Sequence, residues 1–465
     1  MSRSGSRAST RARAIAQQFM SASTSAAQPE PPVLFESNLA VRTYILNRPQ
    51  VRNVLDEPML ALLRPKIEEW STSDLCQTIV GTSVAPKFCA GGDVKAVQKN
   101  ISNPETRLQA IDFFKREFEL DYLLATLTKP YVAILDGITM GGGAGLAAYA
   151  SFRIATENTV FSMPETKIGY CPDVGGSYFL SRLDGELGTY LSLTGGDVKG
   201  RDVFRLGFAT HYIPSRRVPI LLDRLASLEK AHVSVINNTV EEFSAEPLPE
   251  EKPYLLAGET REAIDYAFRH DEVEKIFEDL ETLVDHSSSV VSEWAKQTLQ
   301  ILHLRSPTSL KVALKAIRKG KKMTLFETLQ METRIATAFC NGASPDFKTG
   351  VTAVLINKGK RDDRPAWSPP SYKEVSDELV SRFFAESSPY LSGVPALSIS
   401  EVLKSQETSH LRLHKFALPT EEEIGAMMGV REKVLEVARR KCEIQDNGGD
   451  GNFVWLKWKH QVKSP

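Results

Sequence analysis

Two glycine-rich loops are the parts of this sequence that are best suited to chemistry. The first, Phe88 to Asp93, reads FCAGGD, and the second, Ile138 to Gly145, reads ITMGGGAG. Glycine lets a backbone N–H group approach a ligand without a Cβ in the way, and at a helix start that group has no intrahelical acceptor. Two such loops side by side would form an oxyanion hole, in which each donor contributes about 3 kcal/mol to stabilising a developing negative charge.

Each loop taken alone has a simpler explanation. Glycine-rich turns often serve only as tight strand-to-helix connections or as sites of close helix packing. The second loop also lacks a GK[ST] ending and GxGxxG spacing, which argues against nucleoside triphosphate and dinucleotide binding. The hypothesis of an oxyanion hole therefore depends on the pairing of the two loops.

The elements that must position these loops alternate between strands and helices. Strand-like apolar runs cover Val33 to Phe35, Val41 to Leu46, Thr78 to Val80, Tyr131 to Leu135 and Phe152 to Ala155. Apolar residues at helical spacing fill Pro58 to Trp70 and Leu108 to Leu127. This order predicts an α/β domain.

Beyond Arg216 the pattern becomes mainly helical. Helical spacing recurs in Ile220 to Lys230, Arg261 to Phe268, Val273 to Leu283, Val290 to His303, Ser309 to Lys319 and Leu325 to Cys340. A stretch rich in Pro and Glu, Ala245 to Pro253, predicts a linker. Near the C-terminus, Pro419, Thr420 and Glu423 predict the start of a helix running to about Lys441, before a turn and the basic, aromatic strand FVWLKWKH.

Composition excludes several classes of protein. The 465 residues are 42% apolar and 25% charged, which is typical of a globular chain, and the formal net charge of -1 gives no global reason to bind nucleic acid. The longest apolar stretches are broken by glycines and too short to span a bilayer. The five cysteines show no CxxC or CxxH spacing, which argues against a zinc site or a disulfide framework, so we expect Cys89 and Cys171 to be buried apolar residues.

The N-terminus differs from the rest of the chain. Residues 1–29 contain arginines at positions 3, 7, 11 and 13 among serines and alanines, and no acidic residue precedes Glu30. A basic, serine-rich start without acids is typical of a mitochondrial presequence, which would place the protein in the mitochondrial matrix. A tail without function is the alternative.

Four motifs carry a family resemblance: LNRPQVRNVL, KFCAGGD, KPYVAILDGITMGGGAGL and FSMPETKIGYCPDVGGSYFLSRL. In this order they resemble the signatures of the crotonase superfamily, and within it they are most similar to the 3-hydroxyisobutyryl-CoA hydrolases. The likeness runs from about Val33 to Phe384 and includes SPTSLK, Ser306 to Lys311. It implies a ββα spiral core over residues 30–216, a helical region over 217–384 that completes an acyl-CoA site, and an extension over 385–465.

The resemblance also assigns roles to residues. Backbone N–H groups of Gly92 and Gly142 would hold the thioester oxygen. Hydratases of the superfamily carry a glutamate where this chain has Gly145, whereas their second glutamate matches Glu165 and the hydrolase-type aspartate matches Asp173. A further substrate-binding acid of the hydrolases matches Glu117. This combination favours hydrolysis over hydration of a double bond.

Two mechanisms remain open for the implied hydrolysis. Glu165 would be either the nucleophile that forms an acyl-enzyme anhydride or the base that activates water, while Asp173 and Glu117 would orient the 3-hydroxyl group and the attacking water. Clustered, buried carboxyls raise one another's pKa, so we expect an acidic limb in the pH profile as Glu165 takes up a proton. No cofactor or metal is implied beyond the CoA of the substrate.

Other residues are weaker candidates for the site. His211 has no Ser or Cys partner arranged as a triad, so we expect a packed core role for it. Lys311, Lys348 and Lys358 are candidates to meet CoA phosphates, but each is expected to be a solvated surface charge. Crotonases often form trimers, and the helical region and extension leave the oligomeric state of this chain open.

A second hypothesis concerns the extension, residues 385–465. Some relatives of these hydrolases are components of the mitochondrial small ribosomal subunit. The extension carries basic residues such as Arg439, Arg440 and Lys441, and it interleaves Trp455 and Trp458 with lysines. Such residues pair with phosphates and stack on bases, although an edge strand and helix packed on the protein's own surface would have the same composition.

Overall fold

The computed structural model describes residues 30–84, 87–228, 232–247, 251, 254–358, 363–410, 415–421 and 423–424. The chain divides into two units, Met1–Pro32 and Val33–Pro465, and every element below belongs to the second unit. The predicted presequence, the helix beyond residue 424 and the basic C-terminal strand lie outside the described residues.

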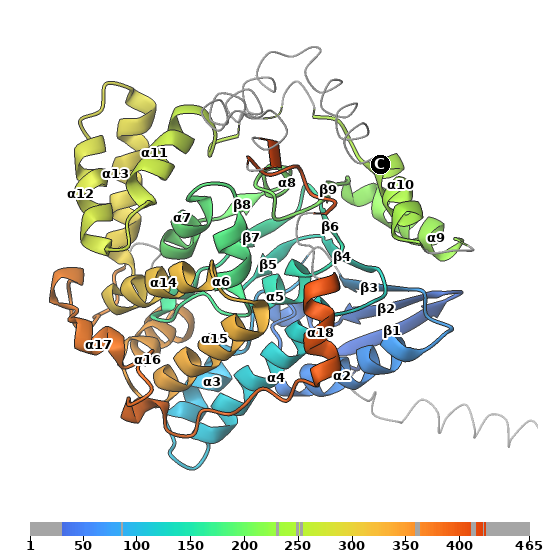
Figure 1. Cartoon of the computed structure of the whole chain (residues 1–465), viewed down its shortest axis with the longest axis horizontal. Coiled ribbons are helices and arrows are strands. Elements are labelled where there is room, and N and C mark those ends of the chain that lie inside the picture. Colours follow the sequence, from blue (N-terminus) through green and yellow to red (C-terminus); the bar gives the residue numbers. More distant parts are fainter. Residues whose placement is uncertain are drawn as a thin grey trace, which may run out of the picture. The chain divides into compact units, whose positions relative to one another are not determined.

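Two sheets form the core of this unit (Figure 1). The larger has the strand order β1 (Val33–Asn38), β2 (Val41–Leu46), β3 (Thr78–Ser83), β4 (Tyr131–Leu135), β6 (Phe152–Ala155) and β9 (His211–Tyr212). Only the pair of β1 and β2 is antiparallel, and the other neighbours are parallel. The smaller sheet contains β5 (Ile138–Met140), β7 (Val160–Ser162) and β8 (Val198–Lys199).

Alternation along the strands of the larger sheet builds two cores. Ile79, Tyr131 and Ala133 face the main core, whereas the intervening residues Val80 and Val132 face a smaller one. This follows from the two-residue period of a strand, which points successive side chains to opposite faces. The smaller core is closed by apolar residues of α9 (Val218–Ala226) and α10 (Val233–Phe243).

The main core is covered by the longer helices of the first half. They are α2 (Glu57–Thr72), α3 (Val94–Ile101), α4 (Arg107–Ala125) and α5 (Gly142–Ala148), with the short helices α6 (Gly176–Phe179), α7 (Leu187–Thr194) and α8 (Asp202–Arg205). Single 3-10 turns are η1 (Pro49–Val51), η2 (Glu165–Ile168), η3 (Leu180–Arg182) and η4 (Ser215–Arg217). Helix α4 is almost wholly buried in its second half, from Glu117 to Ala125.

The helical second half packs on this core. It contains α11 (Gly258–Phe268), α12 (Val273–Leu283), α13 (Ser289–Leu304), α14 (Pro307–Gly320), α15 (Leu325–Cys340), α16 (Asp346–Gly350), the π-helix η5 (Val351–Ile356), η6 (Tyr372–Glu374), α17 (Asp377–Ser381), η7 (Pro389–Leu391) and α18 (Glu401–His410). Helix α15 packs directly against α4. Among the helices that the structure describes, none combines the length and the apolar character needed to cross a bilayer.

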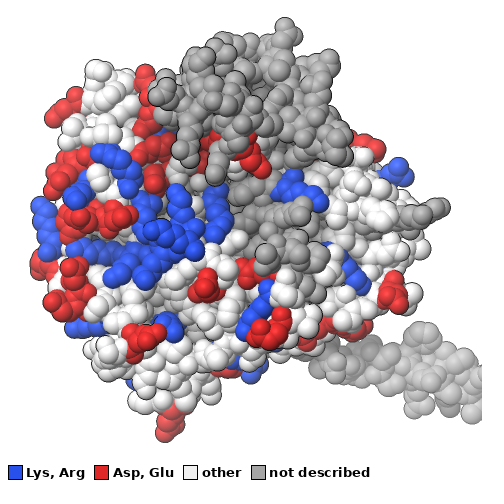
Figure 2. All heavy atoms as spheres, in the orientation of Figure 1, with Lys and Arg blue, Asp and Glu red and all other residues white. Residues whose placement is uncertain are grey.

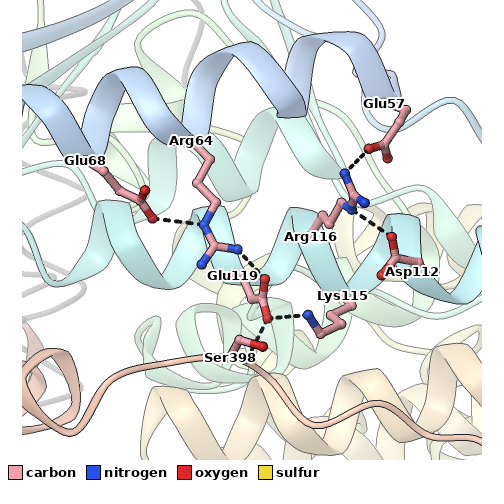
Figure 3. A network of polar contacts seen from close by, with 8 residues as sticks. All are labelled: Glu57, Arg64, Glu68, Asp112, Lys115, Arg116, Glu119 and Ser398. Carbon is pink, nitrogen blue, oxygen red and sulfur yellow. Dashed lines mark hydrogen bonds and ion pairs between the residues drawn. The ribbon is translucent and has the colours of Figure 1, made fainter.

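Polar contacts fasten the C-terminal segment to α4 and α15. Glu119 on α4 is buried, forms ion pairs with Arg64 of α2 and Lys115, and accepts a hydrogen bond of 2.5 Å from the backbone N–H of Ser398 (Figure 3). Glu407 on α18 accepts a hydrogen bond of 3.0 Å from the Tyr122 hydroxyl and another of 2.5 Å from the backbone N–H of Leu325. The segment from Ser398 to Glu407 is therefore part of the folded unit.

The α/β class, the spiral core and the helical second half are confirmed. The predicted helices Val273–Leu283 and Leu325–Cys340 have the same bounds in the structure. The helix start predicted at Thr420 is also present, since Thr420 and Glu423 exchange capping hydrogen bonds. The domain boundaries at 216 and 384 stay a prediction, because residues on both sides belong to one compact unit.

Candidate active site

The structure places the two glycine loops side by side, as the hypothesis of an oxyanion hole requires. The Cys89 N–H group donates to the Ile138 carbonyl at 2.7 Å, and the Met140 N–H group donates to the Cys89 carbonyl at 3.0 Å. This short parallel bridge joins Cys89 with Thr139. The first loop is thereby hydrogen-bonded to the edge of β5.

Backbone geometry leaves a donor available in each loop. Gly142 is the first residue of α5, so its N–H group has no intrahelical acceptor. Gly92 forms a parallel bridge with Leu55, but this bridge uses the Gly91 carbonyl and the Asp93 N–H group rather than the Gly92 N–H group. The two glycines singled out by the resemblance therefore carry the donors that the geometry leaves unused.

The close approach of the loops explains why residues 141 to 143 of the second loop are glycines. A Cβ on Gly143 would lie 2.3 Å from the Cys89 carbonyl oxygen, and a Cβ on Gly142 would lie 2.1 Å from Oε1 of Glu117. The chain also has a φ of 47° at Gly141, which side chains other than glycine rarely adopt. Side chains at these positions would either separate the loops or displace Glu117.

Two predicted carboxyls lie against the loops, and a third lies close enough for its charge to act on both. Glu117 projects from α4, and its Oε1 lies 3.5 Å from where a Cβ of Gly92 would stand. Glu165 begins η2, and its Oε1 lies 3.0 Å from the corresponding point at Gly141. Asp173 lies in the loop before α6. Glu117, Glu165 and Asp173 are 3%, 7% and 6% exposed, so all three are nearly sealed from bulk solvent.

Burial and mutual repulsion govern the charge of this cluster. Burial, and then the charges of Asp173 and Glu165, raise the pKa of Glu117 well above its ordinary value. Burial and the charge of Asp173 raise the pKa of Glu165 in the same way, and burial raises the pKa of Asp173 to about 7. The three carboxyls therefore share protons near neutral pH instead of carrying three charges.

A buried carboxylate on α15 holds the loop that carries Asp173. Glu332 accepts hydrogen bonds from the backbone N–H groups of Gly175, at 2.6 Å, and Ser177, at 2.9 Å. The Tyr149 hydroxyl donates to the Val174 carbonyl at 2.9 Å, and Val174 itself has a φ of 52°. These contacts fix a backbone conformation that valine would otherwise avoid.

The later motifs hold η2 and hence Glu165. The Ser306 N–H group donates to the Thr166 carbonyl at 3.2 Å, and the Ser306 hydroxyl donates to Asp346 at 2.6 Å. A Cβ on Gly350 would lie 2.3 Å from the Ile168 carbonyl oxygen. The SPTSLK motif and the segment after Asp346 therefore position the site from outside it.

The weaker candidates lie away from the cluster. His211 is buried in β9, and its Nε2 lies 3.3 Å from Oε1 of Glu241, which agrees with the expected core role. Lys311 forms an ion pair with Glu274 at 2.6 Å and is structural rather than a free surface charge. Lys348 and Lys358 are exposed, as expected. Cys89 and Cys171 are buried and free.

Two further buried carboxyls, Asp121 and Glu332, lie outside the set predicted from the sequence. Asp121 follows Glu117 by four positions within the run EFELDYLL, a spacing that puts both residues on one face of a helix. Glu332 stands among apolar residues on the buried face of α15. In both cases an acid on an apolar helix face was the available signal.

The two sheets and the paired glycine loops define a crotonase-fold protein. The chain belongs to the enoyl-CoA hydratase/isomerase family, whose sequence model matches residues 41–384. Among solved structures, a protein described as a carnitinyl-CoA dehydratase from Mycobacterium thermoresistibile superposes with a TM-score of 0.67 at 31% identity, covering 78% of this chain and 98% of that one.

Curated relatives carry two different descriptions. A Neurospora crassa protein described as small ribosomal subunit protein mS47 is 42% identical over 84% of this chain and 77% of its own length. The human mitochondrial 3-hydroxyisobutyryl-CoA hydrolase is 39% identical over 76% of this chain and 88% of its own length. The rat hydrolase is 38% identical over 76% and 88%.

Proposed function

We propose that this protein hydrolyses the thioester of 3-hydroxyisobutyryl-CoA to 3-hydroxyisobutyrate and free CoA, as a step of valine breakdown in the mitochondrial matrix. The observation that carries the proposal is the position of Glu117 and Glu165, whose carboxyl oxygens lie against the paired glycine loops. The hydrolases among the relatives support the same reaction. The only cofactor-like group involved is the CoA of the substrate.

In this mechanism the N–H groups of Gly92 and Gly142 hold the thioester oxygen and stabilise its negative charge as the carbonyl carbon is attacked. In one route, the Glu165 carboxylate attacks, the carbon–sulfur bond breaks, the CoA thiolate takes up a proton, and water then cleaves the anhydride. In the other route, Glu165 removes a proton from water, which attacks directly. Asp173 and Glu117 orient the water and the 3-hydroxyl group.

The test is an assay of the purified full-length protein with 3-hydroxyisobutyryl-CoA, in which the released thiol is followed. We expect turnover by the wild type and a loss of at least about 100-fold in kcat for Glu165→Gln. 3-Hydroxypropionyl-CoA and crotonyl-CoA serve as comparison substrates. Hydration of crotonyl-CoA without thiol release, or a fully active Glu165→Gln variant, would contradict the proposal.

Isotope labelling separates the two routes. In a single turnover in water enriched in oxygen-18, attack of water on the Glu165 side of an anhydride would leave the label in that side chain. Mass spectrometry of the peptide containing Glu165 would detect it. Direct attack by water would place the label only in the released acid, as would attack on the acyl side of the anhydride, so label at Glu165 is the result that establishes the anhydride route.

A second proposed role is that of a component of the mitochondrial small ribosomal subunit, with or without hydrolysis. The Neurospora crassa relative supports it. So does a basic surface: Figure 2 shows Lys and Arg gathered over α14. Helix α14 and the turn after it carry four exposed lysines, namely Lys315, Lys319, Lys321 and Lys322. Lys315 and Lys319 lie 5.1 Å and 6.0 Å from the ring centre of Phe384. Basic residues beside an aromatic ring suit an RNA backbone and its bases.

Sedimentation of mitochondrial extract tests this role. We expect comigration with small subunits, weakened when the four lysines are replaced by glutamine and in a chain ending at Ile424. That end point keeps Phe416 in the smaller core and the Glu421 ion pair with Arg261 at 2.9 Å. Sedimentation of the protein only as a free species would contradict ribosome association.

A further inference from the structure

Asp121 fills, from a different helix, the space that a side chain at position 145 would need. A Cβ on Gly145 of α5 would lie 2.9 Å from each carboxyl oxygen of Asp121 and 2.6 Å from Cβ of Val174. Asp121 stands on α4, four residues after Glu117, so the two side chains leave the helix on the same face. The carboxyl absent from α5 is thus replaced by one on α4.

This carboxyl is buried without a hydrogen bond. Asp121 is 0% exposed, and neither of its oxygens has a partner among the residues that the structure describes. An ionised carboxyl in such a place loses its hydration and gains nothing in return, so the neutral acid is strongly favoured.

The groups around Asp121 do not stabilise the ionised form of its carboxyl. The carboxyls that face it are Glu117 on α4, Asp173 before α6 and Glu332 on α15, and burial followed by their charges raises the pKa of Asp121 well above its ordinary value. The remaining titratable groups near it are the Cys89 thiol and the phenols of Tyr44, Tyr131 and Tyr149. Within the described chain, no Lys, Arg or His forms an ion pair with Asp121.

The nearby phenols are committed to other partners. The Tyr131 hydroxyl donates to the Leu146 carbonyl at 2.8 Å, the Tyr149 hydroxyl donates to the Val174 carbonyl at 2.9 Å, and the Tyr44 and Tyr131 hydroxyls are 2.5 Å apart. None of these protons is directed to Asp121. An ionised Asp121 would therefore receive no hydrogen bond from these phenols.

We propose that Asp121 is a positioning residue of the hydrolase site, which as the neutral acid adds no negative charge beside Glu117 on this face of α4. The inference rests on the hydrolase function proposed above. Once Asp121 ionises at high pH, its charge repels that of an ionised Glu117 one helical turn away, and Glu117 moves away from Gly92 and Gly142. The rate of hydrolysis then falls.

The experiment compares Asp121→Asn with Asp112→Asn, a matched change at an exposed residue of α4 that is paired with Arg116. The turnover number kcat and the Michaelis constant KM are measured from about pH 5 to about pH 10. We expect Asp121→Asn to move the alkaline limb of kcat upward by about one pH unit or more, because asparagine cannot ionise. Asp112→Asn should overlay the wild type.

Infrared difference spectroscopy of the free protein gives a readout that does not need turnover. Subtracting the Asp121→Asn spectrum from the wild-type spectrum near neutral pH should reveal the carbonyl stretch of one protonated carboxyl. Asp121→Leu, which has a similar shape without polar atoms, should show the same missing band if the asparagine variant folds poorly. An absent band overturns the inference even when hydrolysis is confirmed.

The kinetic outcomes are equally decisive. An unchanged alkaline limb in a folded Asp121→Asn variant overturns the positioning role. Failure of the wild type to hydrolyse any of the three thioesters refutes the proposed function instead, and the infrared band then still reports whether Asp121 holds its proton.

Discussion

The carboxylate of Glu332 accepts a hydrogen bond of 2.6 Å from the backbone N–H group of Gly175, two residues after Asp173. A second bond, from Ser177, makes Glu332 the anchor of the acidic loop although it does not itself reach the glycine loops. The position of Asp173 therefore depends on a helix that follows it by more than 150 residues in the sequence.

Replacing Glu332 with glutamine should reduce activity through this anchor. One of the two backbone N–H groups would face an amide NH2 group, and an unsatisfied buried donor costs about 1 to 3 kcal/mol. We expect kcat to fall about tenfold or more and the free energy of unfolding to fall by about 2 kcal/mol. Urea denaturation and thiol release measure the two effects, and the exposed Glu386→Gln provides the control.

The carboxyl cluster should make the protein less stable as pH rises. Burial raises the pKa of Asp173 to about 7 and that of Glu332 to about 8, whereas both groups ionise near pH 4 in the unfolded chain. Between these values the folded state holds more protons, so the free energy of unfolding falls with increasing pH by up to about 1.4 kcal/mol per pH unit for each group. Urea titrations at about pH 5, 6 and 7 test the slope, which Asp173→Asn should reduce.

Gly142→Ala should abolish most activity without preventing folding. The added methyl group would lie 2.1 Å from Oε1 of Glu117, which must move away from the glycine loops. We expect kcat to fall by about 100-fold or more, as for loss of an oxyanion-hole donor. Gly196→Ala is the matched control, because its Cβ would meet nothing closer than Oγ1 of Thr194 at 3.4 Å. Equal activity of the two variants would argue against a role for this loop.

Asp173→Asn should move the acidic limb of the residual activity to lower pH. Burial and then the charge of Asp173 raise the pKa of Glu165, and the substitution removes the second cause. The working form of Glu165 is the ionised one, so activity rises with pH through its pKa. A profile of kcat/KM against pH for the variant would locate the limb, and an upward shift would contradict this account of Glu165.

Glu119→Gln should loosen the C-terminal segment. The change removes the charge that pairs with Arg64 and Lys115, and it weakens acceptance from the Ser398 N–H group (Figure 3). Because Glu119 is buried, we expect a loss of about 2 kcal/mol in stability and faster proteolysis near residue 398. Glu68→Gln, at an exposed partner of Arg64, should cost less than about 1 kcal/mol.

Much of the fold follows from local patterns in the sequence. The long helices α12 and α15 have apolar residues at helical spacing and clear ends, so their bounds match the prediction. Helix α10 and strands β8 and β9 were not anticipated. The two strands are two residues long, and such short elements are defined by pairing with distant segments rather than by their own composition.

The residues of the candidate site divide in the same way, into those that local motifs predict and those that tertiary packing defines. Gly92, Gly142, Glu117 and Glu165 could be named from their motifs, and the structure brings them together. Asp121 and Glu332 could not, because their importance lies in what surrounds them: the space beside Gly145 and two backbone N–H groups of the acidic loop. Tertiary packing creates both environments, whereas an acid on an apolar helix face indicates only that the residue is buried.

The contacts of Glu119 and Glu407 tie the C-terminal segment to the helices that carry the carboxyl cluster. One carboxylate fastens the segment to α4 and the other to the first turn of α15, the helices that carry Glu117 and Glu332. Beyond Glu407 the chain is held again, by Phe416 in the smaller core and by the ion pair of Glu421 with Arg261 at 2.9 Å. Tension from the C-terminal end therefore reaches the helices that support the carboxyl cluster only after these contacts give way.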